Sequence, residues 1–134
     1  MASWEQIRGL DPNVIEIGSH TKKHPNCANL TSDKELEDEL YNSKIDIEKN
    51  IGRKIEHCCY PAGSYNERTI AMLKNYGYES AVTIKNGFIN ETSDLYQLNR
   101  VLLNDDFLFF KASVSGSSNM IRKLVRPRSR ISNT

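Results

Sequence analysis

The chain has 134 residues, of which 38% are hydrophobic and 26% charged, and its formal net charge is +1. This balance is typical of a folded globular domain and excludes a disordered chain. The length is sufficient for one hydrophobic core. No apolar run is long enough for a transmembrane helix, and the first residues lack the apolar core of a signal peptide. As written, the chain is expected in the cytoplasm.

Charge is distributed unevenly. Six basic residues and no acidic ones follow Asp106. We therefore expect a domain over residues 1–116 and a basic, flexible tail over residues 117–134. Contact with anionic lipid or nucleic acid is the less favoured alternative for this tail, because no aromatic side chains lie between its charges, and nucleic acid is not an expected partner.

Local signals predict helices and strands in alternation. A short helix is expected over residues 4–10, ended by the turn Asp11-Pro12-Asn13. The apolar run over residues 14–18 is predicted to be a strand.

The next element is the most clearly marked helix of the chain. Ser32 is a suitable N-cap, Glu35 completes a capping box, and Gly52 stands where the helix should end. Leucine and isoleucine recur at helical spacing along it and define its inner face. The charged residues are expected on its solvent-exposed face: Glu37, Asp38, Glu39, Lys44 and Lys49.

The remainder continues the alternation. Strands are expected over residues 54–60, 79–84 and 97–103, and helices over residues 66–76 and 105–115. Strands separated by single helices are typical of parallel βα units, so the sequence predicts the α/β class. The cysteines at positions 27, 58 and 59 have neither a disulfide pattern nor the spacing of a structural zinc site, and free thiols are expected.

Two histidines stand out in Ser19-His20-Thr21-Lys22-Lys23-His24-Pro25. Imidazole is a common metal ligand, and two rings four residues apart can bind one ion. The pair would follow the C-terminal end of a strand, where sites form in α/β proteins. A polar loop with two incidental histidines is the alternative.

Four segments together carry a resemblance to a known family: VIEIGSHTKKHP, CCYPAGSYN, MLKNYGYESAVT and LNRV. They are similar to the polysaccharide deacetylase (NodB-homology) domain, the fourth family of carbohydrate esterases, and the similarity extends from about residue 4 to residue 116. The resemblance implies a distorted parallel (β/α) barrel. It also implies a metal-dependent hydrolase that removes N- or O-acetyl groups from a sugar polymer or glycan.

The family's site residues carry over position by position. His20 and His24 match its metal histidines, and Ser19 and Thr21 match residues that would steady the loop by hydrogen bonds. The expected metal is Zn²⁺, with Co²⁺ or Ni²⁺ as alternatives. The backbone N–H of Ala62 matches the oxyanion donor.

Other family positions are less well preserved. The family often has tyrosine where this chain has Ala62, and arginine where it has Cys59. Arg100 is a candidate for supplying the missing charge, with a surface role as the alternative. Substrate contacts are expected from three residues: Pro61, Gly63 and Tyr65.

The family's paired aspartates, which supply the third metal ligand and the general base, have no match before His20. Asp11 lies in a turn and does not fit that role, and no histidine follows His57 to act as the acid. His57 itself is expected to be a packed or edge histidine. The chain is therefore expected to be the C-terminal portion of the domain, lacking the first strands of the barrel. A missing N-terminal segment, with any leader it carried, or a second chain would complete it.

Two other functions stay open. The chain could be a non-catalytic glycan-binding or assembly module of the same fold, with Tyr60, Tyr65 and Tyr78 stacking on sugar rings. It could also be an unrelated α/β protein in which the two histidines are coincidental.

Overall fold

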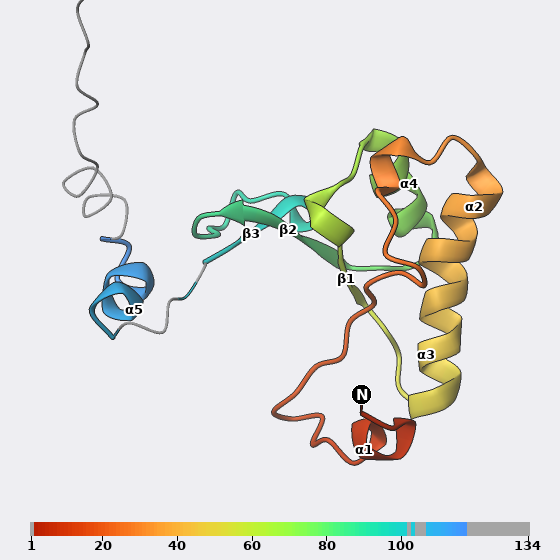
Figure 1. Ribbon diagram of the computed structural model, residues 1–134, viewed down its shortest axis with the longest axis horizontal. Helices are drawn as coiled ribbons and strands as arrows, with labels where there is room; N and C mark the ends of the chain where they lie inside the picture. Colours follow the sequence, from red (N-terminus) through yellow and green to blue (C-terminus); the bar gives the residue numbers. More distant parts are fainter. Residues whose placement is uncertain (1, 102, 104–106, 118–134) are drawn as a thin grey trace, which may run out of the picture.

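The computed structural model describes residues 2–101, 103 and 107–117. Its centre is a sheet of three parallel strands in the order β1 (His57–Cys59), β2 (Ser80–Asn86) and β3 (Leu98–Arg100). Helix α4 (Glu67–Asn75) connects the first two strands, as a parallel pair requires. The predicted α/β class is confirmed, and Figure 1 shows α4 and the long helix to one side of the sheet.

The long helix begins and ends where its local signals predict. The hydroxyl of Ser32 accepts the N–H of Glu35 at 3.4 Å, and Gly52 ends the helix with a left-handed φ of 70°. Between these ends it consists of α2 (Asp33–Glu37), a π-helical turn (Asp38–Asn42) and α3 (Ser43–Ile51). The other described α-helices are α1 (Trp4–Arg8) and α5 (Phe107–Val114). Short 3₁₀ turns are formed by Cys27–Asn29, Pro61–Gly63 and Leu95–Gln97.

The prediction of a strand over residues 14–18 is wrong. Only Ser19 pairs with the sheet, through a parallel bridge to Cys58. Val14 is 78% exposed and Ile15 is 41% exposed. A strand requires a neighbour along its length, and β1 has only three residues, so the apolar pattern alone does not make one here.

The core lies between the long helix, α4 and the sheet. Its fully buried side chains include Leu36, Leu40, Ile55 and Leu73. Apolar burial of this kind is the main stabilising contribution to folding. The apolar inner face predicted for the long helix is therefore the face that packs on the sheet.

Two of the charged residues expected in solvent are buried. Glu39 is 5% exposed and Lys44 is 7% exposed. The Nζ of Lys44 donates to the carbonyl oxygen of Ile55 and to that of Gly77. Both charged residues share the inner face of the helix with Leu36 and Leu40, so helical spacing already placed them there.

The predicted tail lies, apart from residue 117, outside the described residues. In the part of the chain that the structure describes, no helix has both the length and the apolar character to cross a membrane.

Candidate functional site

The loop Ser19–Pro25, called the histidine loop below, begins beside the C-terminal end of β1. Ser19 is joined to β1 by two backbone hydrogen bonds, from its N–H to the carbonyl of His57 (2.9 Å) and from the N–H of Cys59 to its own carbonyl (2.8 Å). Its buried hydroxyl lies 2.8 Å from that of Ser43 on α3. Ser19 thus secures the start of the loop to both the sheet and the long helix.

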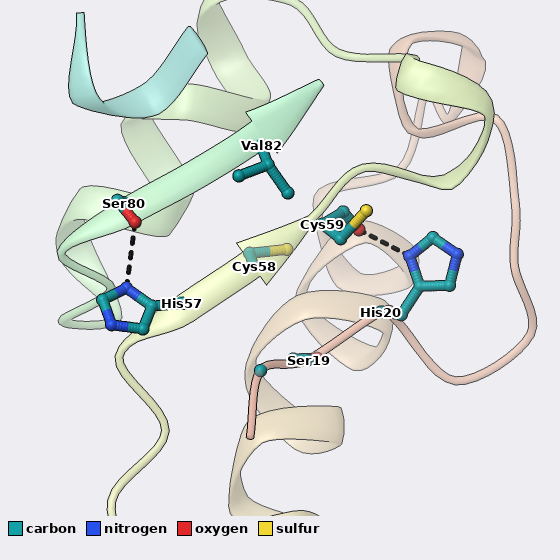
Figure 2. A pocket seen from close by; sticks show the side chains of 8 residues that line it. Ser19, His20, His57, Cys58, Cys59, Ser80 and Val82 are labelled. Atoms are coloured by element: carbon teal, nitrogen blue, oxygen red, sulfur yellow. Dashed lines mark hydrogen bonds between the residues drawn. The ribbon is translucent and has the colours of Figure 1, made fainter. Parts of the chain in front are cut away.

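One ring nitrogen of His20 makes a hydrogen bond to the backbone, and the other has a lone pair that can bind a metal ion. Its Nδ1 lies 2.7 Å from the carbonyl oxygen of Cys59, a contact visible in Figure 2. Because a carbonyl oxygen only accepts hydrogen bonds, Nδ1 carries the hydrogen and Nε2 of the neutral ring keeps its lone pair. A histidine whose second nitrogen donates to a backbone carbonyl is typical of metal ligands.

The ring of His24 lies beside that of His20. The ring centroids are 4.9 Å apart and the ring planes meet at 81°. Two imidazoles that share a tetrahedral ion have centroids about 5 Å apart, given metal–nitrogen distances of about 2.0–2.1 Å. The hydroxyl of Thr21 accepts the N–H of His24 at 3.2 Å. The loop therefore holds the rings at a separation that suits one ion.

Unusual backbone conformations gather around this site. Among the described residues, the non-glycine residues with positive φ are Thr21 (64°), His24 (58°) and Ala62 (50°). Each such conformation costs about 1–3 kcal/mol and is found mainly where function requires it. Two of the three lie in the histidine loop and the third in the turn that follows β1.

That turn, Pro61–Gly63, carries the predicted oxyanion donor. Ala62 is exposed, and its N–H donates to no other described residue. Ser64 ties the turn to the chain beyond the histidine loop, because its hydroxyl donates to Asn26 and accepts the N–H of Ala28. The structure thus links the turn that follows β1 to the residues that directly follow the histidine loop.

A pocket of about 390 Å³ opens beside His20, on the exposed face of β1. His57 lies at its other end, where its Nδ1 is 2.9 Å from the hydroxyl of Ser80 (Figure 2). The lining residues are Gly18, Ser19, His20, His57, Cys58, Cys59, Ser80 and Val82. His57 is half-buried at the start of β1, apart from the histidine pair.

Arg100 and Tyr65 have other partners. The Nε of Arg100 donates to the carbonyl of Thr83 at 2.8 Å, so its described contact is with β2 and not with the histidine loop. The ring of Tyr65 stacks on Tyr60 at 4.6 Å, and its hydroxyl donates to Gln97 at 2.9 Å. Both packing and hydrogen bonding therefore hold Tyr65 in the fold.

The structure adds one acidic residue, Glu39, that the sequence patterns did not predict at the site. The Oε2 atom of Glu39 accepts the N–H of Lys22 at 2.8 Å and that of Lys23 at 2.9 Å. The signal in the sequence is its position three residues after Leu36, which places it on the inner face of the long helix. A charged residue at such a position is buried only with partners.

The three thiols differ in accessibility. Cys27 and Cys58 are buried, whereas Cys59 is partly exposed and lines the pocket. Burial, together with the Glu39 carboxylate, raises the pKa of the Cys27 thiol to about 11, and burial raises the pKa of Cys58 well above its usual range.

At pH 8 iodoacetamide is therefore expected to modify Cys59 first, because the thiolate is the reactive form and both buried thiols stay protonated. Mass spectrometry of peptides from the folded chain, compared with the chain unfolded in urea, measures the order. Equal modification of all three in the folded chain would contradict this expectation.

The two histidines fit part of a metal site. Within the ranges that the structure describes, no three side chains of histidine, cysteine, aspartate or glutamate are placed to hold an ion. A catalytic zinc ion takes three protein ligands and keeps one position open. Among the described residues, His20 and His24 are therefore two candidate ligands, one short of that number.

Comparisons with known proteins agree with the resemblance found in the sequence. Residues 1–81 match the family model described as polysaccharide deacetylase. YxkH of Bacillus subtilis (strain 168), a protein assigned as a polysaccharide deacetylase, is 30% identical over 97 residues. These residues are 72% of this chain and 34% of that protein, so the chain spans about a third of its curated relative.

Solved structures share the fold. The Streptococcus pyogenes deacetylase PplD, in complex with acetate, superimposes with a TM-score of 0.69 at 24% identity, over 74% of this chain and 43% of that one. A Bacillus anthracis protein assigned as a polysaccharide deacetylase gives a TM-score of 0.64 at 29% identity, over 73% and 31% of the two chains. The shared portion is less than half of each of these structures.

Proposed function

Because this chain belongs to the polysaccharide deacetylase family, we propose that it provides the histidine half of a metal-dependent site that removes acetyl groups from a polysaccharide or glycan. The observation that carries this proposal is the arrangement of His20 and His24. One ring has its Nδ1 held by a main-chain carbonyl, and the other lies beside it at a separation that suits a shared ion.

Each described residue has a distinct task in this proposal. His20 and His24 hold the ion, whose charge when bound polarises the acetyl carbonyl and a water molecule. The N–H of Ala62, which donates to no other described residue, would donate to the oxyanion of the tetrahedral intermediate. Imidazole ligands suit Zn²⁺, with Co²⁺ and Ni²⁺ as alternatives.

The reaction also needs a carboxylate to take the proton from water. Among the described residues, none lies with both histidines in a group that could hold an ion, and Glu39 is engaged by backbone N–H groups. We propose that a further segment or a second chain supplies the third ligand and the base. The greater length of the relatives supports this division.

Calorimetric titration with Zn²⁺ tests the histidine pair. The wild-type chain is expected to bind Zn²⁺ weakly, and His20→Ala should reduce the affinity by about tenfold or more, because it removes one of two ligands. The matched control is His57→Ala, which removes the remaining histidine of the chain and should leave the affinity unchanged. Absence of binding by the wild type, or equal loss in both variants, would overturn the proposal.

A glycan-binding assay separates the enzyme from the non-catalytic module. If the chain binds an acetylated polysaccharide equally well with and without a metal chelator, the module becomes the better description. A requirement for Zn²⁺ would instead favour the hydrolase.

A further inference from the structure

Glu39 holds the middle of the histidine loop. A single carboxylate oxygen accepts the N–H groups of Lys22 and Lys23, at 2.8 and 2.9 Å, and these two residues lie between the histidines. The Glu39 side chain reaches the loop from the long helix, so both contacts join segments that are distant in the sequence. They fix the part of the loop that separates the two rings.

The burial of Glu39 needs such partners. A carboxylate that is 5% exposed is strongly destabilising unless hydrogen bonds compensate for the lost water. Its two contacts are charge-assisted hydrogen bonds, which are roughly twice as strong as neutral ones. Removing the carboxylate would leave both loop N–H groups without this acceptor.

Glu39 lies in the π-helical turn Asp38–Asn42. Such widened turns are rare, and those that do occur are often found at functional sites. Around the same turn, Lys22 is joined through its ammonium group to Asp38 at 3.2 Å and to Asp46 at 3.5 Å. These ion pairs are at the surface and contribute little, so the buried carboxylate is the stronger attachment.

The loop needs an external attachment because its own conformation is unfavourable. Thr21 and His24 both adopt positive φ, and the loop's described internal hydrogen bond is the one between them. Without the Glu39 carboxylate, the described contacts left to oppose relaxation of Thr21 and His24 toward ordinary backbone angles are that hydrogen bond and the surface ion pairs of Lys22. Such relaxation would change the separation of the imidazole rings.

We propose that Glu39 is a positioning residue of the metal site: its carboxylate keeps the histidine loop in the shape that places His20 and His24 on one ion. This inference rests on the proposed function. It concerns a residue that touches neither ion nor substrate and acts through the backbone of the loop.

Three substitutions test it: Glu39→Ala, Glu39→Asp and Glu39→Gln. Alanine removes the acceptor, and aspartate withdraws it by one methylene while keeping the charge. Glutamine keeps an oxygen in place, and its amide can face the pocket of about 570 Å³ that Glu39 lines. The matched control is Glu37→Gln, the same chemical change at an exposed position of the same helix.

Two measurements are needed. Glu39→Ala and Glu39→Asp are expected to lower Zn²⁺ affinity by about tenfold or more, as loss of residues supporting a metal ligand does. Both should also raise amide hydrogen exchange of Lys22 and Lys23, measured by NMR without metal, by about tenfold or more. Glu39→Gln should retain most of the Zn²⁺ affinity and most of the protection of the Lys22 and Lys23 amides from exchange. Glu37→Gln should match the wild type in both measurements.

The outcomes are distinct. Wild-type affinity and exchange in Glu39→Asp would overturn the inference, and so would equal losses in Glu39→Gln and Glu39→Ala. If Glu39→Ala does not fold, as circular dichroism would show, the aspartate and glutamine variants still decide. If the wild-type chain binds no Zn²⁺, the proposed function fails, while faster exchange in Glu39→Asp would still establish the hold on the loop.

Discussion

Replacing Gly63 with alanine is expected to lower the free energy of unfolding by about 3 kcal/mol, the sum of a left-handed backbone penalty and an overpacked contact. Gly63 has a φ of 65°, and an added Cβ would lie 2.5 Å from Cγ1 and 3.1 Å from the backbone nitrogen of Ile84 on β2. The closer atom, Cγ1, is attached to the branched Cβ of Ile84 and not at the end of a flexible side chain, and the backbone nitrogen beside it limits how far the turn can shift. Chemical denaturation followed by circular dichroism measures the loss.

Gly52→Ala separates the two causes. Gly52 has a similar φ of 70°, but a Cβ there would meet nothing within 4 Å. This control should lose only about 1 kcal/mol, from the backbone conformation alone. If both variants lose the same amount, the close approach of the turn to β2 is not the cause. Any effect of Gly63→Ala on function would be local, because the turn that contains Gly63 also carries the N–H of Ala62, the proposed oxyanion donor.

Replacing Lys44 with methionine is expected to cost about 3 kcal/mol, because it leaves buried acceptors without their donor. The ammonium group contacts the carbonyl oxygens of Ile55 and Gly77 and lies 3.4 Å from the Glu48 carboxylate. Glu48 also accepts the N–H of Ile55 at 2.9 Å. Together these groups join α3 to the segment that leads into β1.

Methionine keeps most of the aliphatic stem of lysine, so the change removes charge and hydrogen bonds more than volume. Lys49→Met, at an exposed position of the same helix, is the matched control and should alter stability by no more than about 0.5 kcal/mol. Thermal unfolding of the two variants and the wild type measures the difference. A small, equal effect in both would show that the buried ammonium contributes nothing specific.

Much of the fold could be predicted because its signals are local. The Ser32 cap and the Gly52 end of the long helix depend on residues within one turn of each boundary. Helix α4 and strand β2 likewise lie within a few residues of their expected limits. The predicted strand over residues 14–18 failed because pairing depends on a neighbour that a sequence pattern does not contain.

The candidate site could be predicted only in part. The histidine spacing and the turn after β1 are contiguous motifs, so a single sequence displays them. Glu39 and Lys44 were placed in solvent because charge usually indicates exposure, and only tertiary partners reverse that rule. Helical spacing places Glu39 on the inner face, but the backbone N–H groups of the histidine loop that bind its carboxylate are revealed by no pattern of side chains.

The attachment of His20 has a consequence for how this protein can vary. Its Nδ1 is held by the main-chain oxygen of Cys59, an atom that every amino acid presents. Mutations at position 59 can therefore accumulate without altering which nitrogen of His20 is free. Proline is the exception, because Ser19 requires the N–H of that residue. The hydrogen bond that orients His20 thus does not depend on which side chain stands at position 59.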